Sequence, residues 1–285
     1  VDLALRAIMN PGDKILIPMP SYVSYGPMTE LAGGIPVYID TRKDDFKLTA
    51  QNLKKYIDPN VKGIIFNYPA NPTGVSYTRK ELEQLKKVLI SHKILCITDE
   101  IYCDLTYDFT HTAFPSLPGA KEYTLYLNGF SKSFAMTGWR VGYACGPKDI
   151  IAAMTKIHQY TIMCVPITSQ MAACEGLHSS QQSVENMKRE YKRRREFVVT
   201  QLNRIGLKCH MPQGAFYAFP SVAKTGMNGL EFAEKLLADQ KVAVVPGTAF
   251  GDEYTDNIRI SYATGFEKLK EALRRMEVFV QKHKK

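Results

Sequence analysis

A single lysine, Lys132, stands in the segment SKSFAMTGWR, residues 131–140, which ends at Arg140. A protonated lysine amine is a poor nucleophile, and it becomes reactive towards a carbonyl group when it is buried or lies beside another cation. Arg140 is a candidate for that cation and for a phosphate ligand, because a guanidinium binds phosphate through parallel hydrogen bonds. The two residues therefore suggest a site for an aldehyde that carries a phosphate.

Pyridoxal 5′-phosphate has an aldehyde and a phosphate, together with a ring nitrogen and a ring hydroxyl. A carboxylate such as Asp99 would keep the ring nitrogen protonated, which makes the ring an electron sink. Tyr102 and Asn71 would donate hydrogen bonds to the ring oxygen, and an aromatic residue such as Tyr22 would stack on the ring. Each residue also has an ordinary explanation, since the sequence NPTG at 71–74 is a good turn and a lone lysine often lies at the surface. Only the order and spacing of the whole set favour a site.

The elements that must position these side chains follow from apolar runs bounded by Pro, Gly or Asp. Such runs predict strands at residues 14–18, 35–39, 63–68, 94–99, 123–128 and 141–145. Thr78 and Glu81 form a capping box that predicts a helix over residues 79–91. Strands separated by helical segments predict a mostly parallel sheet with helices on both faces. Ligands bind such sheets at the carboxyl ends of the strands, so we expect Asn71, Asp99 and Lys132 to converge there.

The pattern changes after about residue 180. Residues 181–206 read as a long helix, and its basic run KREYKRRR at 188–195 indicates a solvated face rather than a nucleic-acid patch, because apolar residues recur through it at helical spacing. Further helices are predicted at 229–239 and 266–282. We therefore predict a three-layer α/β/α domain over residues 1–185 and a smaller α+β domain over residues 186–285.

The composition is that of a protein with a large core, since 45% of the 285 residues are hydrophobic and 23% are charged. The formal charge of +9 fits a generally basic surface. Six scattered cysteines without a C-x-x-C pair favour reduced thiols in the cytoplasm and argue against a disulfide framework or a zinc site. No apolar run reaches 18 residues and no signal peptide opens the chain, so we expect no membrane partner.

Five segments together resemble the class I and II aminotransferases, which are fold type I pyridoxal-phosphate enzymes. They are NPGDKILIPMPSY, NYPANPTG, DEIY, NGFSKSFAMTGWRVGYA and PQGAFYAFP. The resemblance covers essentially the whole chain. Within the family, the chain is similar to the prokaryotic aspartate, aromatic and N-acetyl-diaminopimelate aminotransferases. It implies the transfer of an amino group between an amino acid and a 2-oxo acid by a ping-pong route. It also implies a homodimer.

The resemblance assigns a role to each cofactor ligand. Lys132 would hold the cofactor as a Schiff base and then move the proton between the substrate Cα and the cofactor. Asp99 would pair with the ring nitrogen, and Tyr102 and Asn71 would bind the ring oxygen. Tyr22 would stack on the ring.

Phosphate and substrate would be bound by cations. Arg140, with a weaker contribution from Ser131, would hold the phosphate, and Arg259 in NIRISYA would bind the α-carboxylate of the substrate through two hydrogen bonds. Many family members carry a serine three residues before the lysine, and this chain has Gly129 there. One phosphate contact is therefore expected to be missing or to come from another group.

Several alternatives stay open at this level. The sequence begins with VDLALRAIM, which reads as a helix in progress, so we expect the N-terminal part of the family fold to be missing. Cofactor binding, dimerisation and activity of this chain are then open, and an inactive fragment is one alternative. A β-lyase, a decarboxylating synthase or a non-catalytic sensor domain would use the same scaffold. The substrate pair is not readable, and acidic, aromatic and acylated amino acids are all candidates.

Overall fold

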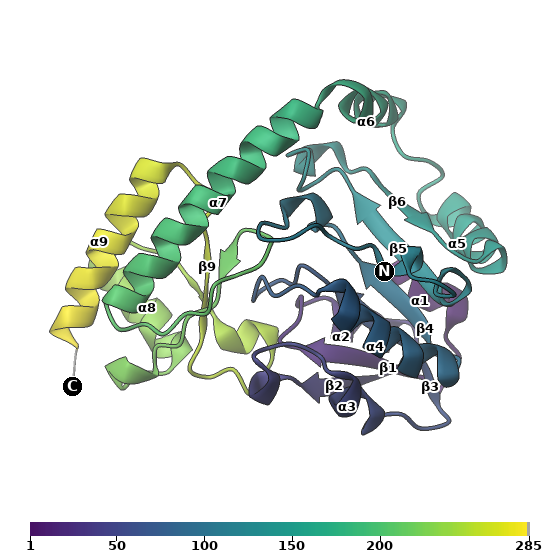
Figure 1. Cartoon of the computed structure of the whole chain (residues 1–285), viewed down its shortest axis with the longest axis horizontal. Helices are drawn as coiled ribbons and strands as arrows, with labels where there is room; N and C mark the ends of the chain where they lie inside the picture. Colours follow the sequence, from purple (N-terminus) through teal and green to yellow (C-terminus); the bar gives the residue numbers. More distant parts are fainter. Residues whose placement is uncertain (284–285) are drawn as a thin grey trace.

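The computed structural model describes residues 1–283, and its larger part is built on a six-stranded sheet (Figure 1). The sheet has the order β2-β1-β3-β4-β5-β6. Strands β1 to β5 run parallel to one another, and the edge strand β6 runs antiparallel to β5. The bounds are β1 Lys14–Met19, β2 Ile35–Asp40, β3 Val61–Asn67, β4 Leu95–Asp99, β5 Thr124–Gly129 and β6 Gly142–Cys145. The predicted strands are thus all present, within two residues at each end.

Helices cover both faces of this sheet, because alternate residues of each buried strand point to opposite sides. Leu16, Ile64 and Cys96 pack with helices α3 (Ala50–Lys54) and α4 (Arg79–Ser91). Ile15, Ile65 and Ile97 pack with helices α1 (Asp2–Ile8), α2 (Tyr25–Leu31) and α5 (Lys148–Thr161). The three-layer α/β/α arrangement is therefore confirmed. The predicted capping box is also confirmed at the start of α4.

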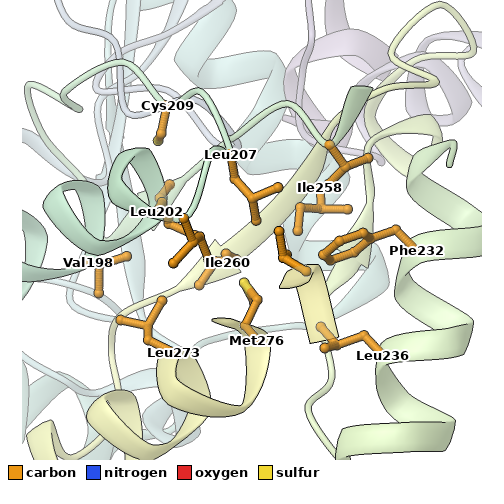
Figure 2. Close-up of a cluster of buried hydrophobic side chains, with 14 of the residues drawn as sticks. Val198, Leu202, Leu207, Cys209, Phe232, Leu236, Ile258, Ile260, Leu273 and Met276 are labelled. Atoms are coloured by element: carbon orange, nitrogen blue, oxygen red, sulfur yellow. The ribbon is translucent and has the colours of Figure 1, made fainter. Parts of the chain in front are cut away.

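The remaining elements form a smaller α+β layer around the antiparallel sheet β7-β9-β8. Figure 2 shows its core, where helices α7, α8 and α9 bury apolar side chains against β9. Helix α7 runs without a break from the side of the large sheet into this layer, as Figure 1 shows. The bounds are α6 Ile167–Ser179, α7 Gln181–Arg204, β7 Tyr217–Ala218, α8 Gly229–Gln240, β8 Val245–Pro246, β9 Ile258–Ser261 and α9 Phe266–Lys282.

The division of the chain between residues 185 and 186 falls inside α7 and stays a prediction. None of the helices within residues 1–283 combines the length and the apolar character needed to cross a lipid bilayer.

Candidate active site

The ends of strands β3, β4 and β5 bring the predicted residues to one edge of the large sheet. Asn67 ends β3 and pairs in register with Asp99 at the end of β4. The Asn67 side chain donates a hydrogen bond to the Asp99 carbonyl over 2.7 Å and accepts one from the Asn71 amide over 3.0 Å. Strand β5 ends at Gly129, three residues before Lys132. Asn67 therefore ties the loop of Asn71 to the strand of Asp99.

The Asp99 carboxylate is held by two donors. Tyr25 O–H donates to one oxygen over 2.7 Å, and the Ile101 amide donates to the other over 3.3 Å. Burial raises the pKa of the Asp99 carboxyl above its ordinary value, and these two hydrogen bonds act against that rise. Burial and the neighbouring carboxylate raise the pKa of Tyr25 well above its ordinary value, so Tyr25 stays a donor.

The Lys132 amine lies between aromatic rings without a polar partner of its own. Its Nζ is 5.9 Å from the ring centre of Tyr102 and 5.9 Å from that of Phe216, and it makes no hydrogen bond or ion pair within residues 1–283. Burial lowers the pKa of Lys132 below its ordinary value. The Asp99 charge opposes this shift, whereas the Arg259 and Arg140 charges add to it. The amine therefore loses its proton more easily than a surface lysine does.

Arg259 reaches this edge from β9 in the smaller sheet. Its Nη1 donates to Asn71 Oδ1 over 3.0 Å. Its guanidinium carbon lies 4.6 Å from the ring centre of Tyr217 and 4.8 Å from that of Phe250, which are cation–π distances. Its Nε is buried and has no hydrogen-bond partner within the described residues. A guanidinium held in place in this way is suited to binding a carboxylate.

Three other predicted residues make fewer contacts here. Arg140 is exposed, takes a left-handed backbone conformation with φ of 54°, and within residues 1–283 donates only to the Thr137 carbonyl, over 2.9 Å. Ser131 contributes its carbonyl oxygen, which accepts from the Thr137 hydroxyl over 2.8 Å. Tyr22 is 42% exposed and meets Tyr25 edge to face, with ring centres 5.5 Å apart. Tyr22 therefore contacts Tyr25, which in turn donates to Asp99. Arg140 acts on Lys132 only through its charge, which lowers the pKa of the amine.

The glycine at position 129, where many family members carry a serine, has a packing reason. It faces Gly142 in the β5–β6 pair, and a Cβ at position 129 would lie 3.0 Å from the Gly142 Cα and 3.1 Å from the Val141 carbonyl oxygen. A side chain there would therefore press against the backbone of β6.

The sequence reasoning missed Tyr25, Asn67 and Tyr217. The Tyr217 hydroxyl lies 3.1 Å from the Tyr102 hydroxyl. Two signals were available, since Tyr25 lies three residues after Tyr22 and Tyr217 lies inside the quoted segment PQGAFYAFP. Neither signal says which residue these hydroxyls contact.

Comparison with known proteins identifies the family of the chain. A family model described as aminotransferase class I and II matches residues 1–276. The chain belongs to the class I and II aminotransferases. YugH of Bacillus subtilis (strain 168) is 49% identical over 283 residues, which cover 99% of this chain and 73% of YugH. An aspartate aminotransferase of Pyrococcus abyssi is 43% identical over 99% of this chain and 74% of its own length.

The fold is shared with solved aminotransferases. The crystal structure of the aromatic aminotransferase from Pyrococcus horikoshii OT3 is 42% identical, with a TM-score of 0.96 over 99% of this chain and 76% of that chain. The aminotransferase therefore has a transaminase's activity, the transfer of an amino group between an amino acid and a 2-oxo acid. Nothing in these comparisons favours a β-lyase or a sensor domain.

Proposed function

We propose that this aminotransferase binds pyridoxal phosphate covalently through Lys132 and uses Lys132 as its proton-transfer base. The observation that carries the proposal is the half-buried Lys132 amine, which has no polar partner within residues 1–283 and lies close to Asp99, Tyr102 and Arg259. Class I and II aminotransferases use this cofactor, and the donor set fits it. When bound, the cofactor supplies an electron sink for the electron pair released at the substrate Cα.

The residues that would hold the cofactor are those of the strand ends. Asp99 would face the ring nitrogen with its carboxylate, steadied by Tyr25. Tyr102 and Asn71 would donate to the ring oxygen. Tyr22 would cover the ring. A cation such as Arg140, exposed and without an acidic partner within residues 1–283, suits the phosphate, and Ser131 is the weaker second ligand.

Lys132 Nζ would accept the proton from the substrate Cα and return it on the cofactor side. A general base works best when its pKa lies near the working pH. Burial lowers the pKa of Lys132, and the Arg259 and Arg140 charges act in the same direction. The rings of Tyr102 and Phe216, with centres 5.9 Å from the amine, flank it on the protein side.

Arg259 would orient the substrate by its α-carboxylate. Asn71 already fixes Nη1, and the rings of Tyr217 and Phe250 flank the guanidinium, so an incoming carboxylate meets a group that needs little reorganisation. Every amino acid carries that carboxylate, so this contact does not select a side chain. The relatives are named for aspartate and for aromatic amino acids, and both classes are the first donors to test.

A homodimer is the assembly that the family resemblance implies. Large apolar side chains on the α5–α6 patch, defined as Tyr160, Ile162, Met163, Ile167 and Met171, are all exposed in the single chain. An apolar surface of this kind is typical of a protein interface. Two further proposals come from the sequence alone. They are a division into two domains between residues 185 and 186 and a cytoplasmic location.

The cofactor proposal is tested by absorbance. The purified chain is titrated with pyridoxal phosphate beside the variants Lys132→Ala and Lys148→Ala, the second being an exposed lysine at the start of α5. We expect a protein-bound visible band in the wild type and in Lys148→Ala, and none in Lys132→Ala. Aspartate or phenylalanine should then bleach the band and yield the 2-oxo acid without free ammonia. A visible band of equal strength in Lys132→Ala would overturn the proposal.

A further inference from the structure

Tyr217, in the segment PQGAFYAFP, lies between the two halves of the site. It is 7% exposed and starts β7, which pairs antiparallel with β9. Tyr217 stands opposite Ser261, so Arg259 is its diagonal neighbour on the same face of the sheet. Its place in the fold therefore sets its ring beside the guanidinium of Arg259.

The ring and the hydroxyl of Tyr217 contact different partners. The guanidinium carbon of Arg259 lies 4.6 Å from the ring centre. The hydroxyl lies 3.1 Å from the hydroxyl of Tyr102, and the two rings meet edge to face at 5.9 Å. Arg259 belongs to the substrate end of the site and Tyr102 to the cofactor end.

We propose that Tyr217 is a positioning residue that serves both ends of the active site, and this rests on the proposed function. Its ring holds the guanidinium of Arg259 in place for the substrate carboxylate. Its hydroxyl donates to the Tyr102 hydroxyl and so directs the Tyr102 proton towards the cofactor ring oxygen. A hydroxyl that accepts a hydrogen bond becomes a stronger donor, which links the two contacts.

Two substitutions distinguish the ring contact with Arg259 from the hydroxyl contact with Tyr102. Tyr217→Phe removes the hydroxyl and keeps the ring, whereas Tyr217→Leu removes both. Loss of the ring removes the cation–π contact that holds the guanidinium, so Tyr217→Leu should weaken carboxylate binding about ten-fold, which corresponds to about 1.4 kcal/mol. Tyr217→Phe should leave carboxylate binding unchanged within about two-fold.

The carboxylate measurement uses the cofactor-free chain. Acetate is titrated against chain labelled with nitrogen-15 arginine, and the Arg259 Nε resonance is assigned from the variant Arg259→Lys. We expect the acetate dissociation constant to rise about ten-fold in Tyr217→Leu and to stay near the wild-type value in Tyr217→Phe. Equal weakening in both variants, or in neither, would overturn the role of the ring.

The hydroxyl is tested on the loaded chain through the pH midpoint of its visible band. A hydrogen bond to the ring oxygen stabilises its anion, so a weaker Tyr102 donor should move that midpoint to higher pH. We expect Tyr217→Phe to raise the midpoint in the same direction as Tyr102→Phe, and to add nothing when combined with it. The ionisable groups that face Tyr102 are Asp99, Lys132, Tyr25, Tyr217 and Arg259.

The matched control is Tyr254→Phe, another buried tyrosine, whose hydroxyl has no partner within the described residues. It should leave both measurements at their wild-type values. An unshifted midpoint in Tyr217→Phe would overturn the role of the hydroxyl. A wild-type chain without any lysine-dependent band would instead overturn the proposed function, and the acetate titration would still decide the role of the ring.

Discussion

At the scale of single residues, the site holds a charged carboxylate, that of Asp99, in a place that water does not solvate. The Asp99 carboxylate is buried at the end of β4 and depends on the Tyr25 hydroxyl and the Ile101 amide for its hydrogen bonds. Burial nevertheless raises the pKa of Asp99 above its ordinary value. The ionised carboxylate therefore costs the cofactor-free chain stability, and the ring nitrogen of the cofactor would offset that cost.

This cost predicts that Asp99→Asn stabilises the cofactor-free chain at neutral pH. A carboxyl whose pKa is raised by folding favours the folded state below its unfolded pKa, and that contribution is lost as the pH rises through the folded pKa. An amide avoids the loss, and its oxygen still accepts the Tyr25 hydrogen bond, while the weaker bond from the Ile101 amide is given up because an NH2 group cannot accept. We expect the melting temperature of Asp99→Asn to exceed that of the wild type at pH 7, and the difference to vanish under acid conditions.

The measurement is thermal unfolding across pH, with the exposed Asp252→Asn as the control. The same variant should bind pyridoxal phosphate more weakly, because a neutral amide cannot hold a protonated ring nitrogen. A lower melting temperature for Asp99→Asn at neutral pH would show that the carboxylate stabilises the empty site.

At the scale of elements, a buried arginine of α7 is one of the contacts that join the smaller α+β layer to the part of the chain with the large sheet. Arg195 has a side chain that is only 3% exposed, and its two terminal nitrogens donate to the Asp108 carboxylate over 2.6 and 3.0 Å. It also donates to the Pro212 carbonyl over 2.7 Å and lies 4.8 Å from the Tyr107 ring centre. Removing the Asp108 charge would leave this buried cation with the Pro212 carbonyl and with the exposed Glu196 carboxylate, which lies 3.5 Å from Arg195 Nη2.

We expect Asp108→Asn to lower the free energy of unfolding by about 1–2 kcal/mol at pH 7. The figure is at the low end for a buried cation because the Asp108 side chain is 41% exposed and solvent screens it. The Arg195 hydrogen bonds lower the pKa of Asp108, so the wild-type advantage is present above the ordinary pKa of an aspartate. It should disappear as the pH falls through the lowered pKa.

Urea unfolding at several pH values measures this, with Asp239→Asn as the matched control. Asp239 pairs with Lys282 over 3.3 Å on the surface, where solvent screens the pair, so its substitution should cost less stability than that of Asp108. Equal losses at the two positions would mean that the burial of Arg195 adds nothing.

Elements were predictable from the sequence where the signal is local. Strands such as β1 and β4 are apolar runs with clear bounds, and α4 carries its own capping box, so their positions follow from neighbouring residues. The meeting of Asn71, Asp99 and Lys132 at one edge follows from the rule for parallel strand ends. The partners of the site residues do not, because Tyr25 and Asp99 are 74 positions apart and Tyr102 and Tyr217 are 115 apart. Such pairings depend on how the layers pack.

At the scale of the whole molecule, apolar surface gathers where the last turn of α5 leads into α6. Within the α5–α6 patch, Tyr160 is 86% exposed and Met163 is 81% exposed. A monomer rarely exposes a contiguous patch of large apolar side chains, and closed two-fold pairs are the commonest way for identical chains to cover one. In the proposed homodimer, the α5–α6 patch packs against the same patch of a second copy.

We therefore expect the double variant Tyr160→Glu, Met163→Glu to shift the chain towards monomer, because two like-charged carboxylates would face their copies across a two-fold axis. Sedimentation velocity over a range of concentrations measures the shift, and the dimer dissociation constant should rise at least about ten-fold, which corresponds to about 1.4 kcal/mol. The control is Leu237→Glu, which charges an exposed apolar residue of α8. Unchanged sedimentation in the double variant would place the dimer contact on another surface, and the α5–α6 patch would then need a different partner.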